Sequence, residues 1–213
     1  MIEARAREAI VRISGLLGAR GWVANHDGNV SARVSPVRFM VTPTATHKMS
    51  VRTQDLAVTD AAGRQISGTR KPPGEFGLHL GIYRARTDVG AVVHAHPPFA
   101  TALGVSGREL VVFLPEAVVS LGARVPLVPL TLPGAAAVTA MQPFVQSFDA
   151  VLVSGNGVWA WGDDPDQAYL RVELVEHLAT IAARAVTWGG PGALPVDVVD
   201  AMLEVRKKIF SGR

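Results

Sequence analysis

An apolar run that ends in two histidines and two prolines constrains the fold of this chain most strongly. His94 and His96 follow the apolar residues 89–93, and Pro97 and Pro98 come soon after. Successive side chains of a strand point to opposite faces, so His94 and His96 would share one face. The prolines place the pair at a strand end, where open sheets tend to form clefts. The pattern predicts either a metal-binding pair or two structural histidines that cap a strand.

Length and composition define the class of protein. With 213 residues, 48% of them hydrophobic, the chain can bury a substantial core, and we expect a single domain over 1–213. There is no cysteine, so a metal would be held by imidazole, carboxylate, amide or water. The 21 Lys and Arg are scattered among 18 Asp and Glu, which argues against a nucleic-acid-binding face. Without a leader segment or an apolar run of membrane-spanning length, we expect a soluble, cytoplasmic protein with no membrane partner.

Helix and strand signals alternate along the chain without a linker. Apolar residues at helical spacing, together with capping residues, predict the helices, and short apolar runs bounded by Gly or Pro predict the strands. The expected helices span 3–20, 75–86, 99–105, 135–141, 164–186 and 196–209. One strand is expected to follow a turn at 27–31 and to end at Val34. The other expected strands span 39–42, 56–60, 64–67, 89–96, 110–114, 125–130, 150–153 and 158–162.

Glu75 is the second residue of interest. It follows the stiff stretch 71–74 and begins an expected helix, where the helix dipole favours an ionised carboxylate. That helix and the strand reaching His94 run in opposite directions, so Glu75 could return close to the two histidines. A glutamate at a helix start can also be a simple cap. One turn on, His79 is expected to be a structural histidine.

Several polar residues in turns are further candidates. Asn29 lies in a turn that could cradle an anion, although most such turns are ordinary loops. Thr42, Thr44 and Lys48 could meet a phosphate or carboxylate, or could belong to a solvated loop. Asn156 stands between two glycines at another strand end.

Glutamates elsewhere carry weaker signals. Glu116 precedes an apolar run, where a carboxylate is either exposed or functional. Glu173, Glu176 and His177 belong to the long helix expected at 164–186, and we expect them on its polar side.

These residues, in order and spacing, resemble the class II aldolase/adducin family over nearly the whole chain. The resemblance rests on residues 28–31, Thr42-Pro43-Thr44, Glu75 with His79, residues 91–96 and the helix carrying Val172 to His177. The family contains fuculose-phosphate aldolases, ribulose-phosphate 4-epimerases and methylthioribulose-phosphate dehydratases. It implies an α/β fold, a single three-layer αβα domain with a central, mainly antiparallel sheet. It also implies a homotetramer with active sites between subunits.

The resemblance also implies roles for individual residues. His94 and His96 match two zinc ligands, and Glu75 matches a carboxylate that ligates the ion and acts as base or acid. Asn29, Thr42 and Thr44 match positions that contact a substrate phosphate, and we add Lys48 to this group. Glu116 matches a position where an adjacent subunit supplies a catalytic side chain.

Three departures from the family pattern affect these expectations. Asn156 stands where the family has a third histidine, and Pro73-Gly74 replaces a pair of serines. Ala45 replaces a glycine. An amide oxygen is a harder ligand than imidazole, so we expect a divalent metal, Zn²⁺ first, with Mn²⁺ or Mg²⁺ as alternatives. The lost hydroxyls leave open whether the substrate is phosphorylated.

Three functions remain open. The first is a metal-dependent aldolase-type lyase that makes or breaks a C–C bond in a ketose-like or hydroxy-carbonyl substrate through a metal-stabilised enediolate. The second is a related dehydratase, decarboxylase or epimerase acting on a sugar acid or similar compound. The third is a non-catalytic, adducin-like assembly module. Glu75, His94 and His96 together favour an enzyme.

Overall fold

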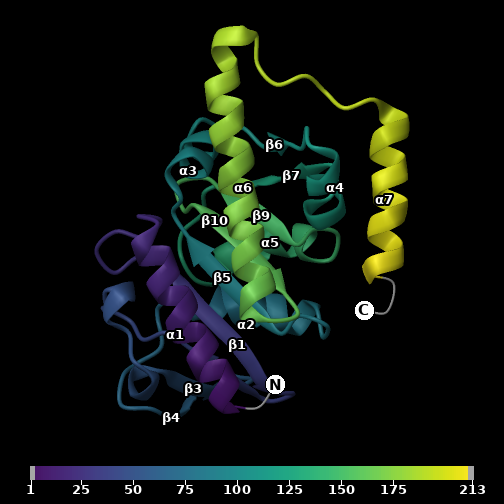
Figure 1. Ribbon diagram of the computed structural model, residues 1–213. Helices are drawn as coiled ribbons and strands as arrows, with labels where there is room; N and C mark the ends of the chain where they lie inside the picture. The colour runs from purple at the N-terminus through teal and green to yellow at the C-terminus, as the bar shows by residue number, and fades with distance from the viewer. Residues whose placement is uncertain (1–2, 211–213) are drawn as a thin grey trace.

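The computed structural model describes residues 3–210 and contains one large sheet with helices on both faces (Figure 1). The helices are α1 (Glu3–Ala19), α2 (Phe76–Ala85), α3 (Pro98–Val105), α4 (Pro115–Leu121), α5 (Ala135–Val145), α6 (Pro165–Ala185) and α7 (Val196–Phe210). The strands are β1 (Asn29–Ser35), β2 (Arg38–Val41), β3 (Ala57–Asp60), β4 (Gln65–Ser67), β5 (Ala91–Ala95), β6 (Leu110–Val111), β7 (Arg124–Val125), β8 (Leu127–Val128), β9 (Ala150–Val153) and β10 (Val158–Gly162).

Eight of these strands form the central sheet, in the order β4-β3-β2-β1-β5-β10-β9-β8. All neighbours in it are antiparallel except β8 and β9, which are parallel. The predicted mainly antiparallel sheet is therefore confirmed. The histidine strand β5 lies at its centre, between β1 and β10, and all five of its residues are buried. Valine is abundant in these strands because a β-branched side chain suits a pleated, buried surface.

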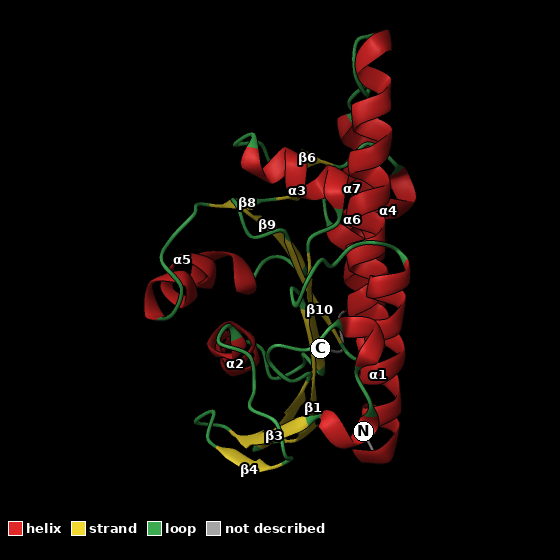
Figure 2. Cartoon of the chain, turned by 90° about the vertical axis from the view of Figure 1, so that its left-hand side faces the viewer, coloured by secondary structure: helices red, strands yellow, loops and turns green. Residues whose placement is uncertain are grey.

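Helices cover the sheet on both faces, which confirms the three-layer arrangement (Figure 2). Helices α1 and α6 pack on one face, where Ile10, Val93 and Val172 belong to the larger apolar core. Helices α2 and α5 lie on the other face, where Leu78 and Trp159 belong to a second core. Alternate residues of β5 enter the two cores, as the strand period requires. Among the described residues, no helix is long and apolar enough to cross a membrane.

Local signals place the start of the longest helix. The Asp164 side chain accepts a hydrogen bond from the backbone N–H of Gln167 at 2.8 Å, and Pro165 occupies the first helical position. Both features are typical of a helix N-terminus. The expected start of the helix is therefore confirmed, and its observed end at Ala185 lies one residue before the expected end.

Three elements differ from the prediction. Helix α5, expected over 135–141, continues to Val145. The strand expected over 110–114 is limited to Leu110–Val111, and the chain turns at Leu114 into helix α4. Pro115 supplies the fixed φ of a first helical turn, and short apolar runs do not distinguish strand from helix. The segment expected to be extended over 125–130 contributes two short strands, β7 and β8, which belong to different sheets.

Glu176 corrects one expectation about α6. We expected its side chain on the polar face, but the residue is buried, and its carboxylate accepts hydrogen bonds from the backbone N–H groups of Phe99 (3.1 Å) and Ala100 (2.8 Å). These N–H groups belong to the first turn of α3, which has no helical partner for them. Burial raises the pKa of Glu176, and the two hydrogen bonds offset part of that shift. The carboxylate thus joins α6 to α3.

Candidate functional site

The pairing of three central strands sets the position of the histidines. In the sheet register His94 of β5 lies opposite Asn29 of β1 on one side and opposite Trp159 of β10 on the other. This row lies near the end of β5, as the prolines at 97 and 98 predict. The side chains of this row therefore lie where the central strands end, while the strand pairing fixes their backbones.

The two ring nitrogens of His94 have different partners, which define the protonation state of the ring. Its Nδ1 lies 3.1 Å from the carbonyl oxygen of Val158, and a carbonyl only accepts, so Nδ1 carries the hydrogen. Burial lowers the pKa of His94 to about 4, an effect that the carboxylate of Glu75 partly offsets. The ring is therefore neutral near pH 7, and Nε2 offers a lone pair. This is the usual arrangement of a metal-ligating imidazole.

His96 lies close enough to share a ligand with His94. The two Nε2 atoms are 3.2 Å apart, with the rings inclined at 61°. Two nitrogens bound to a tetrahedral zinc at about 2.0–2.1 Å would lie about 3.3 Å apart. The spacing of the pair therefore fits two positions of such an ion.

Trp159 holds the His94 ring from the other side, a role that the sequence did not reveal. The two rings stack with centroids 4.2 Å apart and an interplanar angle of 12°. His79 meets the edge of Trp159, with centroids 5.1 Å apart. Its Nδ1 hydrogen-bonds the hydroxyl of Ser31 at 2.7 Å, and that hydroxyl also bonds Tyr83. His79 is thus buried in the structural network that supports the site.

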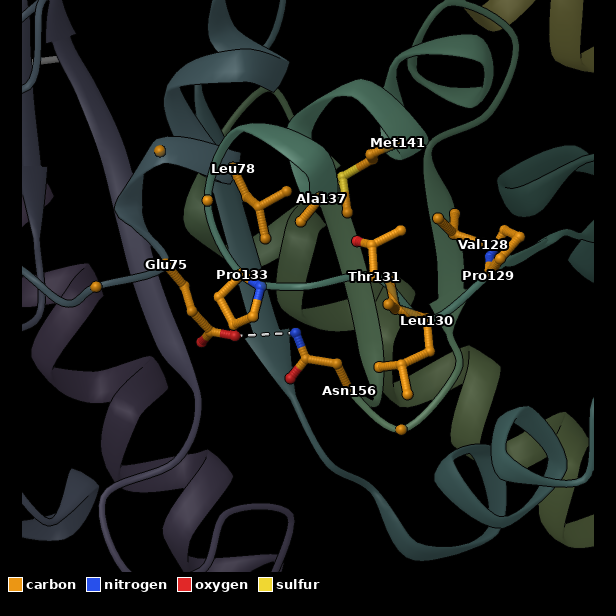
Figure 3. A pocket seen from close by; sticks show the side chains of 15 residues that line it. Glu75, Leu78, Val128, Pro129, Leu130, Thr131, Pro133, Ala137, Met141 and Asn156 are labelled. Atoms are coloured by element: carbon orange, nitrogen blue, oxygen red, sulfur yellow. Dashed lines mark hydrogen bonds between the residues drawn. The ribbon is translucent and has the colours of Figure 1, made fainter.

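Glu75 is fixed beside the histidines by two asparagines. It is the residue immediately before helix α2, and its Oε2 lies 3.5 Å from His94 Nε2. The side-chain amide of Asn29 donates to Oε2, and that of Asn156 donates to Oε1, both at 2.9 Å. Figure 3 shows the second of these bonds, between two residues that line a cavity. The amide nitrogen of Asn156 therefore faces the carboxylate.

Two glycines allow backbone segments to approach the histidine strand closely. Gly157 has φ +63°, and a Cβ there would lie 2.7 Å from Cδ2 of His96. Gly28 has φ +75°, and a Cβ there would lie 2.9 Å from the carbonyl oxygen of His94. A side chain at either position would combine backbone strain with a steric clash.

Charged ligands for a metal are few at this site. Within the described part of the chain, no group of three His, Cys, Asp or Glu side chains stands ready to hold an ion. The two imidazoles fit an ion as they stand, whereas the Glu75 carboxylate is bonded to two amides. Any further ligand would come from a movement of Glu75, from the amide oxygen of Asn156 or from bound substrate and water.

The other predicted binding residues lie on the loop that follows β2. Thr42 is buried, and its hydroxyl accepts from the N–H of Val30 at 3.2 Å, whereas Thr44 is exposed. Ala45 has φ +50°, so the loop keeps the left-handed backbone that favours glycine. Lys48 is buried, and its Nζ donates to two backbone carbonyl oxygens at 2.9 and 3.0 Å. Two of its three donors are therefore already used.

Glu116 is not part of this cluster within one chain. It lies exposed in the first turn of α4, and Figures 1 and 2 both show α4 apart from α2, the helix that begins after Glu75. One chain thus brings together Asn29, Glu75, His94, His96 and Asn156, but not Glu116.

Comparison with known proteins agrees with this fold. Residues 8–183 match the family model "Class II Aldolase and Adducin N-terminal domain". The chain is 32% identical to a methylthioribulose-1-phosphate dehydratase of Methylococcus capsulatus, covering 85% of this chain and 94% of the relative. It is also 32% identical to an L-fuculose phosphate aldolase of Methanococcus vannielii, covering 80% and 92%.

Solved structures show the same architecture. The YgbL protein of Klebsiella pneumoniae, a candidate aldolase, epimerase or decarboxylase, superposes with a TM-score of 0.88 at 27% identity, over 95% of this chain and 99% of that one. An L-fuculose 1-phosphate aldolase superposes with a TM-score of 0.87 at 24% identity, over 95% and 96%. The chain therefore belongs to the class II aldolase and adducin N-terminal domain family.

Proposed function

We propose that this protein is a divalent-metal-dependent enzyme that makes or breaks a C–C bond in a small hydroxy-carbonyl substrate. The observation that carries the proposal is the pair of Nε2 atoms of His94 and His96, 3.2 Å apart, with a Glu75 oxygen 3.5 Å from the first. Two neutral nitrogen ligands beside a positioned carboxylate can combine Lewis-acid and proton-transfer chemistry. The family membership supports this reaction class.

His94 and His96 would hold the ion, and Asn156 or Glu75 would complete its protein ligands. Two imidazoles favour Zn²⁺, while an amide or carboxylate oxygen as third ligand also suits Mn²⁺ or Mg²⁺. When bound, the ion polarises the substrate carbonyl and stabilises negative charge that develops on its oxygen.

Glu75 would move the proton. Its carboxylate is aimed at the histidine pair by the amides of Asn29 and Asn156, which hold one oxygen each. A fixed carboxylate beside the polarised carbon can remove or return a proton at the position next to the carbonyl. We propose further that Asn29, Thr42, Thr44 and Lys48 contact the polar end of the substrate.

A dehydratase is the second candidate, because relatives of equal identity carry that name. The dehydratase and the aldolase are both 32% identical to this chain, and both are named for phosphorylated substrates. Both reactions can start from the same carbanion-like state next to a carbonyl, so the cluster serves either. The assembled polar cluster argues against a purely structural, adducin-like module.

Glu116 would act from a neighbouring subunit of a homotetramer. Its exposed position on α4, away from Glu75 in the same chain, is consistent with a contribution in trans. Mixing Glu75→Gln and Glu116→Gln subunits should then restore activity that each variant lacks. No recovery after mixing would contradict the shared site.

Exchange of substrate hydrogens with solvent tests the chemistry without knowledge of the full substrate. We expect the zinc-loaded protein to exchange the hydrogens next to the carbonyl of dihydroxyacetone, or of its phosphate, for deuterium in D₂O. Glu75→Gln should lower the exchange rate by about 10²- to 10⁴-fold, the usual contribution of a general base. Proton NMR of the two compounds measures the rate and shows whether the phosphate matters.

The control is a histidine remote from the site. His177 is exposed on α6, and His177→Ala should exchange at the wild-type rate, whereas His94→Ala and His96→Ala should not. Equal rates with and without His94 and His96 would refute the proposed centre.

A further inference from the structure

The last helix, α7, lies beside the short helix α4 (Figure 1). Val199 and Met202 of α7 are partly buried against the larger core, which includes Val118 of α4. Within Val196–Phe210 no side chain is fully buried. A helix with so small a buried face depends on a few specific contacts for its position, because packing of the apolar face supplies most of the stability of a helix.

Arg206 of α7 holds the C-terminal end of α4. Its Nη1 donates hydrogen bonds to the carbonyl oxygens of Val119 and Ser120, at 2.8 and 2.6 Å. Carbonyl groups in the last turn of a helix have no partner within the helix, and the helix dipole favours a positive charge beside them. Because α4 spans only Pro115–Leu121, these two carbonyls make up much of its C-terminal end. Arg206 therefore caps α4 from a different helix.

The other end of the Arg206 guanidinium binds a buried carboxylate. Its Nη2 donates to Oδ2 of Asp149 at 2.5 Å. Asp149 is buried just before β9, and two further arginines bind it, Arg171 of α6 at 2.9 Å and Arg86 at the end of α2 at 3.2 Å. A guanidinium can serve several acceptors at once because its donors diverge in a fixed fork. Arg206 therefore connects α4 to a carboxylate that the two main helix layers hold in place.

Glu116 lies at the opposite end of this short helix. It occupies the first turn of α4, and Ser120 follows it after about one helical turn, or about 6 Å along the axis. Leu114 precedes α4, and its apolar side chain offers no hydrogen bond to cap that end. A displacement of the capped end would therefore move Glu116 with the rest of the helix.

We propose that Arg206 is a positioning residue for Glu116, and that it orients α4 so that this carboxylate reaches the site of a neighbouring subunit. This role rests on the proposed function, in which Glu116 acts in trans. Arg206 binds Asp149 at the start of β9, whereas Asn156 follows the end of that strand, so Arg206 lies away from the histidine site of its own chain. Its loss should impair the subunit that donates Glu116 and spare the subunit that receives it.

Subunit mixing separates the donating from the receiving role. Arg206→Met removes the guanidinium and keeps an unbranched side chain, and we expect the solvent-exchange rate of the zinc-loaded variant to fall by about 10²-fold, as for a small misplacement of a catalytic group. When it is mixed with Glu75→Gln subunits, activity should return in about a quarter of the randomly assembled sites, because one chain supplies Glu75 and the other a well-placed Glu116. When it is mixed with Glu116→Gln subunits, neither chain donates a well-placed Glu116, and we expect no recovery.

A second variant and a matched control complete the design. Arg206→Lys keeps a positive charge for Asp149, but a compact ammonium cannot span the carboxylate and both carbonyls of α4. It should show the same mixing pattern with a smaller loss, and it retains the charge if Arg206→Met does not fold. Lys207→Met changes the next residue of α7, which forms an exposed ion pair with Glu204, and should exchange at the wild-type rate.

Each result of the mixing has a distinct meaning. Recovery with Glu116→Gln but not with Glu75→Gln would show that the Arg206 variant donates normally and receives poorly, which would overturn the proposed role. Recovery with neither partner in both Arg206 variants, or a wild-type rate for Arg206→Met alone, would overturn it as well. If Glu75→Gln and Glu116→Gln subunits do not complement each other, the shared site itself is refuted, and the role of Arg206 fails with it.

Discussion

At the scale of single residues, Lys48 shows how this site combines burial with charge. Its ammonium is buried against the carbonyl oxygens of His26 and Thr46, and burial lowers its pKa from 10.5 to about 8 despite the nearby carboxylates of Asp27 and Glu75. A neutral amine still has two N–H donors, one for each carbonyl. Deprotonation therefore removes the cost of a buried charge while both hydrogen bonds remain.

This shift predicts a stability change at alkaline pH. Between the folded pKa of about 8 and the unfolded value of 10.5, the unfolded chain binds more protons, so the contribution of Lys48 to stability rises with pH. The free energy of unfolding of wild type relative to Lys48→Met should increase by about 1–2 kcal/mol from pH 8 to pH 10. Urea unfolding of the chelator-treated proteins measures it. The exposed residue Lys71 provides the control, since Lys71→Met should show no such trend. A difference between wild type and Lys48→Met that stays constant with pH would contradict the lowered pKa.

The role of a single residue could be predicted when it depends on neighbours in the sequence, but not when it depends on contacts with distant parts of the chain. His94, His96 and Glu75 follow from strand period and helix start, which are local signals, and the structure brings them together. The stack of Trp159 on His94 depends on the register of β10 against β5, which no local pattern specifies. The burial of Lys48 likewise depends on a carbonyl of His26, a residue 22 positions earlier.

At the scale of elements, the contact between α6 and α3 rests on Glu176. Its carboxylate binds the N–H groups of Phe99 and Ala100 at the start of α3, the helix that follows the histidine strand directly. A negative group at a helix N-terminus is also favoured by the helix dipole. The carboxylate thus fixes the segment that carries the chain away from His96.

Removing this carboxylate should destabilise the protein. Glu176→Ala leaves two N–H groups without partners, at a cost of about 1–3 kcal/mol in the free energy of unfolding. Glu173→Ala is the matched control on the same helix, because it removes a partly exposed ion pair with Arg20, worth about 0–1 kcal/mol, and a long hydrogen bond from the Tyr169 hydroxyl at 3.4 Å, but leaves no backbone N–H without a partner. Chemical denaturation compares the two. Equal, small losses would show that Glu176 does not hold α3.

Most elements could be predicted because period and capping signals are strong in them. Helix α6 has both an N-cap and a regular apolar stripe, and the predicted C-terminal end differs from the observed one by a single residue. The segment 110–114 is short and apolar throughout, so its partial strand could not be distinguished from the turn into α4. Glu176 was misplaced because a helical pattern does not show which element packs against a polar face.

At the scale of the whole molecule, the central sheet separates the larger apolar core from the candidate site. Helices α1 and α6 cover one face of the sheet, and α2 and α5 lie on the other (Figure 2). The first face contains the larger apolar core, whereas the second contains Glu75, the cavity and the Trp159 stack. The proposed chemistry would thus take place on the face with the smaller core, where a cavity lies between α2 and α5. The layered fold could be predicted from the family resemblance, but the cavity could not, because it depends on how α5 packs.

A crystal structure of the protein grown with Zn²⁺, with anomalous diffraction measured on both sides of the zinc absorption edge, tests the central claim most directly. We predict one zinc peak per chain, bonded to Nε2 of both His94 and His96 at about 2.0–2.1 Å. The same peak should disappear in His96→Ala crystals. A zinc-soaked crystal with no anomalous peak between these two nitrogens, or with its peak bound elsewhere in the chain, would contradict the account.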